Sequence, residues 1–446
     1  MKRAVLRGLR AAGLGLRSPA GATGGGDTGG GWRAEADRRI RGHRMGEFAV
    51  TVHAPDGSRL AGAAVSARLR RHRFGFGTCV TPLLLAADED GRRYREHVLD
   101  HFNMVVCENA MKWSAVERER GVERWEQADA LLAFADREGL AMRGHCLFWG
   151  TRDAVRAQPW LDRLGAADLR AAVARRLRAA VERYRGRVVA WDVENELLDG
   201  GFYARRLGRD IVPWMFRAAR EIDPAVPLFT NEYGILGSEA KLDRYRALIE
   251  TLRAAGAPVG GIGIQEHAAQ RFAPAGRRLG APPALAPPEV WRRLDRLAAH
   301  GLPIHVTEVS SPTADEGRRA DSLDTLFRVA FAHPAVEAIL LWGFWAGAHW
   351  RGRHAALVDE DWEQLPAGAR LADLLRREWS TSIEARADAG GVVRFRGFHG
   401  RYEVTADLAG GRGSAWIDLG PDHATAEARL ARALASRTGG SGSASA

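Results

Sequence analysis

Polar and aromatic residues follow short apolar runs at many places along this 446-residue sequence. Glu196 and Glu308 stand after two such runs, and amide, imidazole, ammonium and indole side chains follow the others. Amides and carboxylates bond hydroxyl groups, whereas an indole offers a broad apolar face on which a sugar ring can stack. The combination favours a carbohydrate-binding site. Its candidate members are Glu108, Asn109, Lys112, His145, Trp149, Asn195, Glu196, Tyr233, Gln265, His267, Glu308, Trp342 and Trp350.

Glu196 and Glu308 are the two carboxyl groups that we expect to hydrolyse a glycosidic bond. This chemistry needs one protonated and one ionised carboxyl group, so the surroundings must separate the two pKa values. A separation of about 5–5.5 Å would give retention of the anomeric configuration, and about 6.5–9.5 Å would give inversion. A single glutamate after a strand is more often a solvated charge. The hypothesis therefore depends on the whole set of residues.

Eight apolar runs alternate with helical segments over most of the chain, and this order predicts an α/β fold. Residues 169–184 have the clearest helical period, behind the candidate N-cap Asp168, and a second helix begins at Ser238. Eight such units predict a (β/α)8 barrel, in which function lies at the carboxyl ends of the strands. A doubly wound open sheet is the alternative, but no G-x-G-x-x-G follows the first run. The runs are 76–80, 104–107, 141–148, 188–193, 228–230, 261–264, 304–307 and 338–342.

Small β segments are expected on both sides of the barrel. Residues 47–73 alternate in hydrophobicity around the turn 55–57, and residues 381–437 contain spaced Val, Phe, Tyr and Trp among glycines. We expect these two segments to pair with each other. The barrel would then occupy residues 74–380. Residues 1–46 are interpreted as a leader with a Gly-rich linker, and 438–446 as a disordered tail.

The formal charge of +10 requires a nucleic-acid partner to be considered. The excess comes from arginines spread along the chain rather than gathered in one stripe, so we expect no nucleic-acid partner. No apolar stretch is long enough for a membrane helix, and three cysteines argue against a disulfide framework. Arg7 and Arg10 interrupt the apolar region that a secretory signal would need.

Five ordered motifs resemble glycoside hydrolase family 10, the endo-β-1,4-xylanases. They lie between about residue 74 and residue 379, and the two glutamates are 308 − 196 = 112 positions apart, close to the spacing of the family. Further likeness to the plant-type enzymes lies in residues 196–203, 357–362, 365–366 and 397–404. The motifs are ENAMKW (108–113), RGHCLFW (143–149), WDVENE (191–196), GIGIQEH (261–267) and TEV (307–309).

The resemblance implies a TIM barrel and a retaining double displacement, with Glu196 as acid/base and Glu308 as nucleophile. It implies that Glu108, Asn109 and Lys112 bind the sugar on the non-reducing side of the cleaved bond. His145, Trp149, Asn195, Gln265 and His267 would surround the sugar at that bond, and Trp342 and Trp350 would form aromatic walls. The partner would be xylan, with no cofactor and no metal. We expect an extracellular monomer that does not bind membranes.

Three positions depart from the pattern of the family. Gly150 stands where a histidine is usual, Ser310 where an aspartate is common, and residues 231–234 read NEYG in place of NDYN. Both catalytic glutamates are intact. The alternatives are a glycosidase on the same scaffold that acts on another β-linked glycoside, and a barrel that binds carbohydrate without cutting it.

Overall fold

The computed structural model describes residues 31–272, 285–409 and 411–432. Within them the chain forms two compact units, which we call the barrel unit and the sandwich unit. The described part of the barrel unit is residues 31–43 and 74–378, and that of the sandwich unit is residues 44–73 and 379–432. None of the helices in these ranges combines the length and apolar character needed to cross a lipid bilayer.

The barrel unit is a closed parallel barrel, as the alternation of apolar runs predicts. Its strands follow the order β5-β4-β3-β11-β10-β9-β8-β7-β6, and a β5–β7 pairing closes the ring. The third apolar run forms two short strands, β5 and β6, which both pair with β7. The strands are β3 (Gly75–Val80), β4 (Met104–Cys107), β5 (Ala141–Gly144), β6 (Phe148–Trp149), β7 (Val188–Asn195), β8 (Leu228–Tyr233), β9 (Gly261–Glu266), β10 (Ile304–Val309) and β11 (Val336–Leu341).

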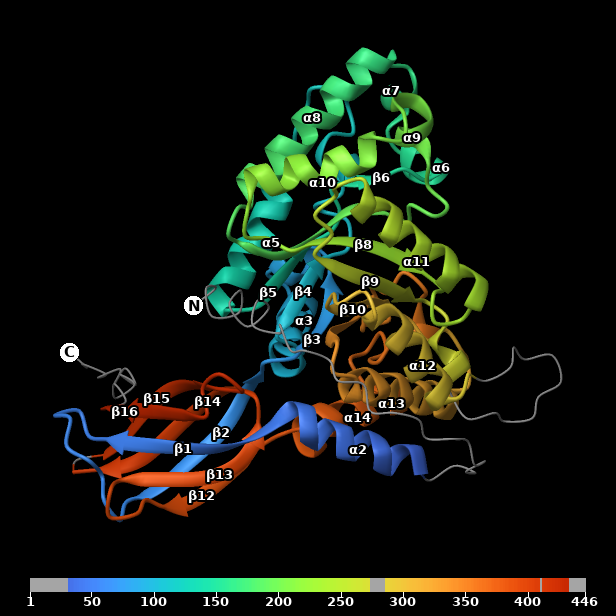
Figure 1. Ribbon diagram of the computed structural model, residues 1–446. Helices are drawn as coiled ribbons and strands as arrows, with labels where there is room; N and C mark the ends of the chain where they lie inside the picture. Colours follow the sequence, from blue (N-terminus) through green and yellow to red (C-terminus); the bar gives the residue numbers. More distant parts are fainter. Residues whose placement is uncertain (1–30, 273–284, 410, 433–446) are drawn as a thin grey trace, which may run out of the picture. The chain divides into compact units, whose positions relative to one another are not determined.

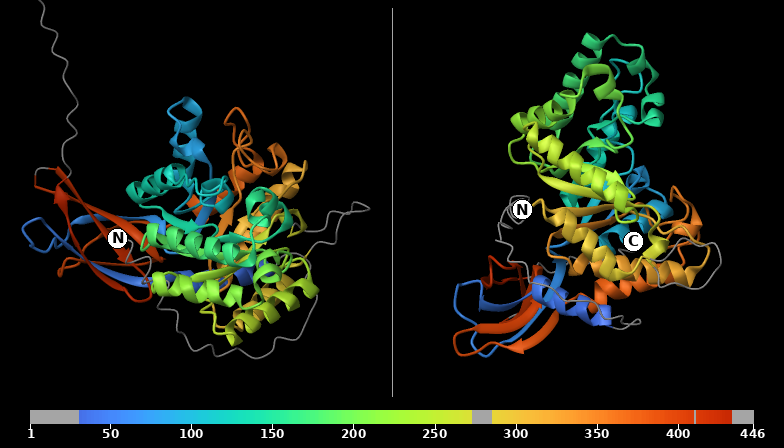
Figure 2. Two further views of the ribbon diagram at one scale, coloured as in Figure 1. Left: turned by 90° about the horizontal axis from the view of Figure 1, so that it is seen from above. Right: turned by 45° about the vertical axis from the view of Figure 1, so that its right-hand side comes forward.

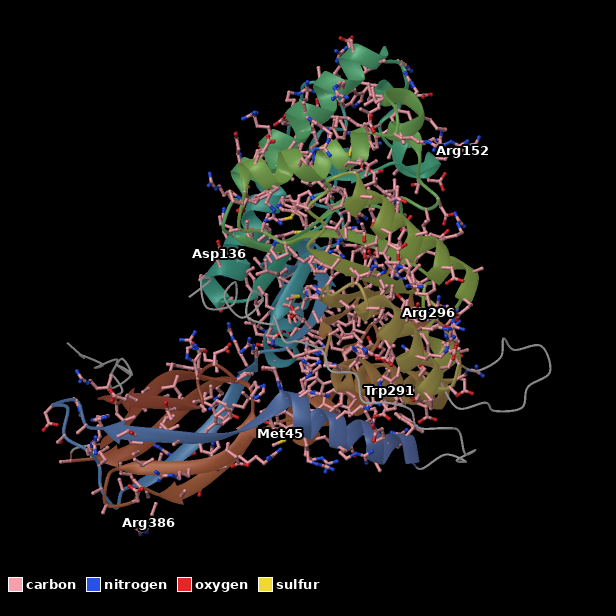
Figure 3. All side chains as sticks on the ribbon, viewed as in Figure 1. Met45, Asp136, Arg152, Trp291, Arg296 and Arg386 are labelled. Atoms are coloured by element: carbon pink, nitrogen blue, oxygen red, sulfur yellow. The ribbon has the colours of Figure 1, made fainter. Side chains whose placement is uncertain are left out.

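Helices surround these strands on the outside of the barrel (Figures 1 and 2). Trp291 on α12 is buried and donates its indole N–H to the Val329 carbonyl 3.0 Å away, which ties α12 to α13 (Figure 3). The helices are α2 (Gly31–Arg44), α3 (Glu89–His101), α4 (Trp113–Val116), α5 (Glu126–Glu138), α6 (Arg152–Arg156), α7 (Pro159–Asp162), α8 (Ala166–Arg183), α9 (Phe202–Leu207), α10 (Ile211–Ile222), α11 (Glu239–Ala254), α12 (Pro287–Ala298), α13 (Glu316–Ala332) and α14 (Pro366–Asp373). Shorter turns of helix are η1 (Pro82–Leu85), η2 (Ala269–Phe272), η3 (Arg353–Ala355) and the π-helical η4 (Leu374–Glu378).

Local sequence signals set most helix starts, and two of them differ from expectation. Ser238 caps α11 as predicted, because its hydroxyl accepts the Lys241 amide at 3.3 Å. Asp168 is not the N-cap of α8: Gly165 has that role, and Asp168 lies in the first turn, where its carboxylate favours the helix dipole. A helix, α2, also stands where a linker was expected. Its Ala36 and Ile40 are buried, which gives the segment an apolar stripe one turn long.

The sandwich unit is built from both ends of the chain, and the predicted pairing of these ends is confirmed. β1 pairs with β13 and β16 in one sheet, while β2 lies between β12 and β14 in the other. Side chains from both sheets form one apolar core around Tyr402 and Val404. The strands are β1 (Met45–His53), β2 (Ala64–His72), β12 (Ser382–Arg386), β13 (Val392–Phe398), β14 (Gly400–Leu408), β15 (Gly411–Leu419), β16 (Thr425–Arg429) and β17 (Ala431–Arg432).

Residues 1–30 of the expected leader and linker, residues 433–437 of the expected C-terminal β segment and the expected tail 438–446 lie outside the described residues. All three cysteines, Cys79, Cys107 and Cys146, are free and buried in the barrel unit, as the sequence predicted.

Candidate active site

Glu308 lies at the carboxyl end of β10 and is held by two neighbours. Its side chain is almost fully buried, with 5% of the residue exposed. Asn231 on β8 donates its amide to Glu308 Oε1 at 2.9 Å, and His267 Nε2 lies 3.2 Å from Oε2. Each carboxylate oxygen therefore has one partner, and the side chain is fixed in orientation.

The surroundings of Glu308 favour its ionised form. Burial alone would raise the pKa of this carboxyl group, because a charge loses its hydration inside a protein. The hydrogen bond with His267 and the electrostatic influence of His145, His267 and Lys112 outweigh burial and lower the pKa below its ordinary value. Glu308 is thus a carboxylate near neutral pH.

Glu196 directly follows β7 and has the opposite preference. Burial, and then the negative charge of Glu308, raise the pKa of Glu196. The indole N–H of Trp149, 2.9 Å from Oε2, and a hydrogen bond with Gln265 offset this rise only in part. Asn231 links the two glutamates, because its side chain donates to Glu308 and its carbonyl accepts the Glu196 amide at 2.8 Å. Their surroundings separate the two pKa values in the direction that acid catalysis beside a nucleophile requires.

Asn231 connects the two catalytic candidates, although it was not among the predicted site residues. Its Nδ2 donates to Glu308 and to Asn195 Oδ1, both at 2.9 Å, and its Oδ1 accepts the Thr307 hydroxyl at 2.6 Å. Gln265 Nε2 donates to the same Asn195 oxygen at 3.2 Å. The signal that could have found Asn231 is its place directly after the apolar run 228–230. In the structure it pairs with Asn195 across β7 and β8.

Ser310 orients the His267 imidazole, a role that an aspartate commonly has in the family that the sequence resembles. Its hydroxyl lies 3.2 Å from His267 Nδ1, and Trp350 Nε1 donates to the same oxygen at 3.2 Å. The Trp350 ring stands edge-on to His267, with ring centroids 4.8 Å apart. A neutral hydroxyl therefore holds the imidazole, and 45% of Trp350 remains exposed for contact with a ligand.

Lys112 lies among aromatic residues close to the two glutamates. Its Nζ donates to Asn109 Oδ1 at 3.0 Å and lies 4.9 Å from the centre of the Trp149 ring and 5.9 Å from that of Trp342. Burial raises the pKa of nearby Glu108, and the charge of Lys112 offsets part of that rise. These predicted residues therefore belong to the same region as the catalytic pair.

His145 is held in place by a buried network of charged residues that the sequence did not indicate. His145 Nδ1 lies 2.9 Å from Asp192, which also pairs with Arg143, and Arg143 lies 2.9 Å from His305. Asp192 keeps a lowered pKa: burial would raise it, but Arg143 and His145 outweigh that effect. The ring of His145 also meets Trp342 edge-on, with centroids 5.2 Å apart.

Tyr233 lies at the edge of this group, with 40% of the residue exposed. Lys241 Nζ lies 3.1 Å from the centre of its ring and pairs with Asp199 at 2.8 Å. The position fits contact with a ligand away from the cleaved bond. Among the described residues no three His, Cys, Asp or Glu side chains gather in a way that would hold a metal ion.

Comparisons with known proteins agree with this geometry. The family profile described as Glycosyl hydrolase family 10 matches residues 66–374. Endo-1,4-beta-xylanase 2 of Arabidopsis thaliana is 37% identical over 352 residues, which is 78% of this chain and 31% of that protein. Anti-sigma-I factor RsgI6 of Acetivibrio thermocellus is 38% identical over 380 residues, 85% of this chain and 47% of that protein.

A solved structure gives the same result for the fold. Xylanase 10B from Thermotoga petrophila RKU-1, in complex with xylobiose, is 25% identical and superposes with a TM-score of 0.60. The match covers 68% of this chain and 94% of that chain. The chain spans less than half the length of the two curated relatives above.

Proposed function

Because the chain belongs to glycosyl hydrolase family 10, we propose that it hydrolyses internal β-1,4-xylosidic bonds of xylan with retention of configuration. The observation that carries this proposal is that the surroundings of Glu196 raise its pKa while the hydrogen bond and charges around Glu308 lower the pKa of that group. Retaining hydrolysis requires this asymmetry, since one group must donate a proton while the other attacks carbon. The matched profile spans both residues.

The first chemical step breaks the glycosidic bond. The Glu196 carboxyl group gives its proton to the leaving glycosidic oxygen, while the Glu308 carboxylate attacks the anomeric carbon from the opposite face. The products of this step are the shortened chain with a new hydroxyl group and a glycosyl ester on Glu308. Asn231 and His267 orient the attacking carboxylate before the reaction, at 2.9 and 3.2 Å.

The second step returns both glutamates to their initial state. Glu196, now ionised, takes a proton from a water molecule, and that water attacks the anomeric carbon and displaces Glu308. Esterification removes the negative charge of Glu308, which is one of the two causes that raise the pKa of Glu196. The pKa of Glu196 therefore falls while the ester exists, and this fall suits its change from acid to base.

The remaining polar and aromatic residues would bind the xylan chain. Glu108, Asn109 and Lys112 offer hydrogen-bonding groups to sugar hydroxyls, and Trp342 and Trp350 offer ring faces. We also propose that the enzyme acts outside the cell as a monomer, since its substrate is a cell-wall polymer.

Release of reducing sugar from glucuronoxylan by the purified chain tests the function. The parent is expected to release sugar, whereas Glu196→Ala and Glu308→Ala are expected to lose almost all release. Glu117→Gln is a matched control, because Glu117 is equally buried but bonds Trp113, Gly121 and Arg175. A folded parent that releases no sugar from any xylan would contradict the proposal.

A further inference from the structure

Three further glutamates are buried next to the active site, and the reaction above does not use them. They are Glu194 on β7, Glu232 on β8 and Glu266 on β9, and none is more than 2% exposed. Each directly adjoins in sequence a member of the polar network at the strand ends, and neighbouring residues of a strand point to opposite faces. The adjoining members are Asn195, Asn231 and Gln265.

All three glutamates make the same hydrogen bond. One carboxyl oxygen accepts a backbone amide from the loop that follows the preceding strand of the barrel. A glutamate on β7 thus holds the loop after β6, one on β8 the loop after β7, and one on β9 the loop after β8. The donors are Gly150 to Glu194 (3.1 Å), Leu198 to Glu232 (2.8 Å) and Leu236 to Glu266 (2.9 Å).

Two of these loops directly follow candidate-site residues, Trp149 at the end of β6 and Tyr233 at the end of β8, and the loop after β7 carries Glu196 itself. Leu198 is two positions beyond Glu196, whose backbone has a positive φ of 57°. A positive φ is costly for a residue with a side chain and persists only when the surroundings hold it. The bond from Leu198 to Glu232, together with the 2.8 Å bond from the Glu196 amide to the Asn231 carbonyl, supplies such a hold.

Burial favours the uncharged form of each of these glutamates. In all three the second oxygen, Oε2, is buried and has no hydrogen-bond partner. An anion there would lack solvation, and burial accordingly raises the pKa of Glu194 and Glu232 to about 8 and that of Glu266 to about 7. Each glutamate faces other charged or titratable groups. Glu194 faces Glu232 and Tyr203, and Glu266 faces Arg271, His267 and Arg293. The groups around Glu232 are Lys241, Glu196, Asp199 and Tyr245.

Gly150 gives independent support to the first of these bonds. A Cβ atom at position 150 would lie 2.7 Å from Glu194 Oε1 and 3.2 Å from the Tyr203 ring. A side chain at 150 would therefore displace the carboxyl group that receives the Gly150 amide. The glycine at this position, where the family usually has a histidine, leaves room for the Glu194 carboxyl group beside the loop.

We propose that Glu194, Glu232 and Glu266 are positioning residues, which fix three consecutive active-site loops as uncharged carboxylic acids. The proposal rests on the proposed function, because the loops matter for catalysis only if Glu196 is the acid. Glu232 has the largest role of the three, since its bond lies nearest to Glu196. Glutamine at 232 would keep both the carbonyl acceptor and the neutrality, whereas leucine would remove the acceptor.

Comparison of the parent with Glu232→Gln and Glu232→Leu tests the proposal. With soluble xylo-oligosaccharides, Gln is expected to leave kcat within a few-fold, while Leu lowers kcat on the order of 10²-fold with a smaller change in KM, as misplacement of a catalytic group does. Amide hydrogen exchange over residues 196–201 gives a readout independent of activity. Exchange should quicken in the Leu variant and stay slow in the Gln variant.

The pH dependence of Tm tests the uncharged state without any substrate. The pKa of Glu232 is about 8 in the folded chain against an ordinary 4.5, so the folded state keeps a proton that the unfolded state loses between these values. Glu232 therefore contributes stability that is lost as pH rises from about 4.5 to about 8. Glu232→Gln lacks this contribution and keeps only those of Glu194 and Glu266, so its stability falls less than that of the parent. The Tm of Glu232→Gln minus the Tm of the parent should therefore increase between pH 5 and pH 8.

The outcomes separate this proposal from the proposed function. A Tm difference that stays constant or moves against glutamine between pH 5 and pH 8 would overturn the uncharged state of Glu232. Slow exchange in a folded Leu variant would overturn the positioning role. If Glu232→Leu does not fold, the Gln variant still decides through kcat and Tm. A parent without xylanase activity contradicts the proposed function, while the exchange and Tm arms still decide the loop bond.

Discussion

The barrel unit and the sandwich unit treat buried polar groups in opposite ways. The described part of the sandwich unit buries the hydroxyl groups of Ser66, Thr381 and Tyr402, but none of its Asp, Glu, Arg or His residues is classed as buried. Every fully buried Asp, Glu, Arg and His of the described chain lies in the barrel unit. A buried charge destabilises a fold unless it is paired, so its retention indicates a use other than packing.

This difference in buried charged residues distinguishes the unit that carries the active site from the unit whose buried residues serve packing alone. The sandwich core consists of apolar side chains from two sheets, arranged around Tyr402. The barrel places four of its buried glutamates, Glu194, Glu232, Glu266 and Glu308, at the ends of β7–β10, where they bond the active-site loops or Asn231 and His267. Changes in the first region should alter stability alone, and changes in the second should alter chemistry first.

The largest expected effect is that of Glu308→Ala. Loss of the nucleophile should lower kcat about 10⁴-fold or more, as the removal of a covalent catalyst does in other enzymes. The Tm should change only slightly. The variant loses two hydrogen bonds of the carboxylate, but it also removes the energetic cost of burying that charge. The rate on xylan and the Tm of the same preparation give both quantities. A loss of rate no larger than that in Glu117→Gln would contradict the assigned role.

The matching change in the sandwich unit is Tyr402→Ala. Tyr402 is completely buried, and its hydroxyl donates to the Phe398 carbonyl at 2.6 Å. Removal of a large core ring costs about 3–5 kcal/mol of folding free energy. Urea unfolding should show that loss, while kcat on soluble substrate stays unchanged below the transition. Tyr402→Phe, which loses only the hydrogen bond, should cost about 1 kcal/mol. A large fall in kcat for either folded variant would break the comparison.

The pH profile is expected to shift in Trp149→Phe. Activity should fall at high pH as Glu196 loses its proton and at low pH as Glu308 gains one. The Trp149 indole N–H lowers the pKa of Glu196, so its removal should raise that pKa and move the alkaline limb of kcat/KM to higher pH. The acid limb, which reports Glu308, should stay in place. A shift of the alkaline limb to lower pH would show that Glu196 is not the group observed.

The smallest expected effect is that of Ser310→Ala. The variant removes the 3.2 Å contact that orients His267, and the bond of His267 is one of the causes that lower the pKa of Glu308. One neutral hydrogen bond is worth about 1 kcal/mol, so kcat/KM should fall about 5-fold. The acid limb should move to slightly higher pH. An unchanged acid limb would mean that Ser310 does not act through His267.

The sequence predicted the barrel because hydrophobic period is a local property. All eight apolar runs became strands, and the polar residues at their ends came together, since parallel strands end at one rim of a barrel. The residue at which an individual helix begins was harder to predict. The N-cap of α8 is Gly165 rather than Asp168, because both residues are possible cap residues and they lie within one turn of each other.

The relations between strands could not be predicted from one chain of letters. Asn231 joins Glu308 to Asn195 through a register that depends on how β7 and β8 align. The roles of Glu194 and Glu266 depend on which face of a strand each residue takes and on which loop lies above it. Such contacts join residues dozens of positions apart, and no local pattern records them.

The central claim, that Glu308 is the nucleophile and Glu196 the acid/base, is tested most directly by azide rescue of the two alanine variants. An activated aryl xylobioside would be the substrate, and NMR would give the anomeric configuration of the glycosyl azide formed. In Glu196→Ala, azide should replace water in the second step and give the β-azide. In Glu308→Ala, azide should attack in place of the carboxylate and give the α-azide. The reverse configurations, or the same configuration from both variants, would contradict the account.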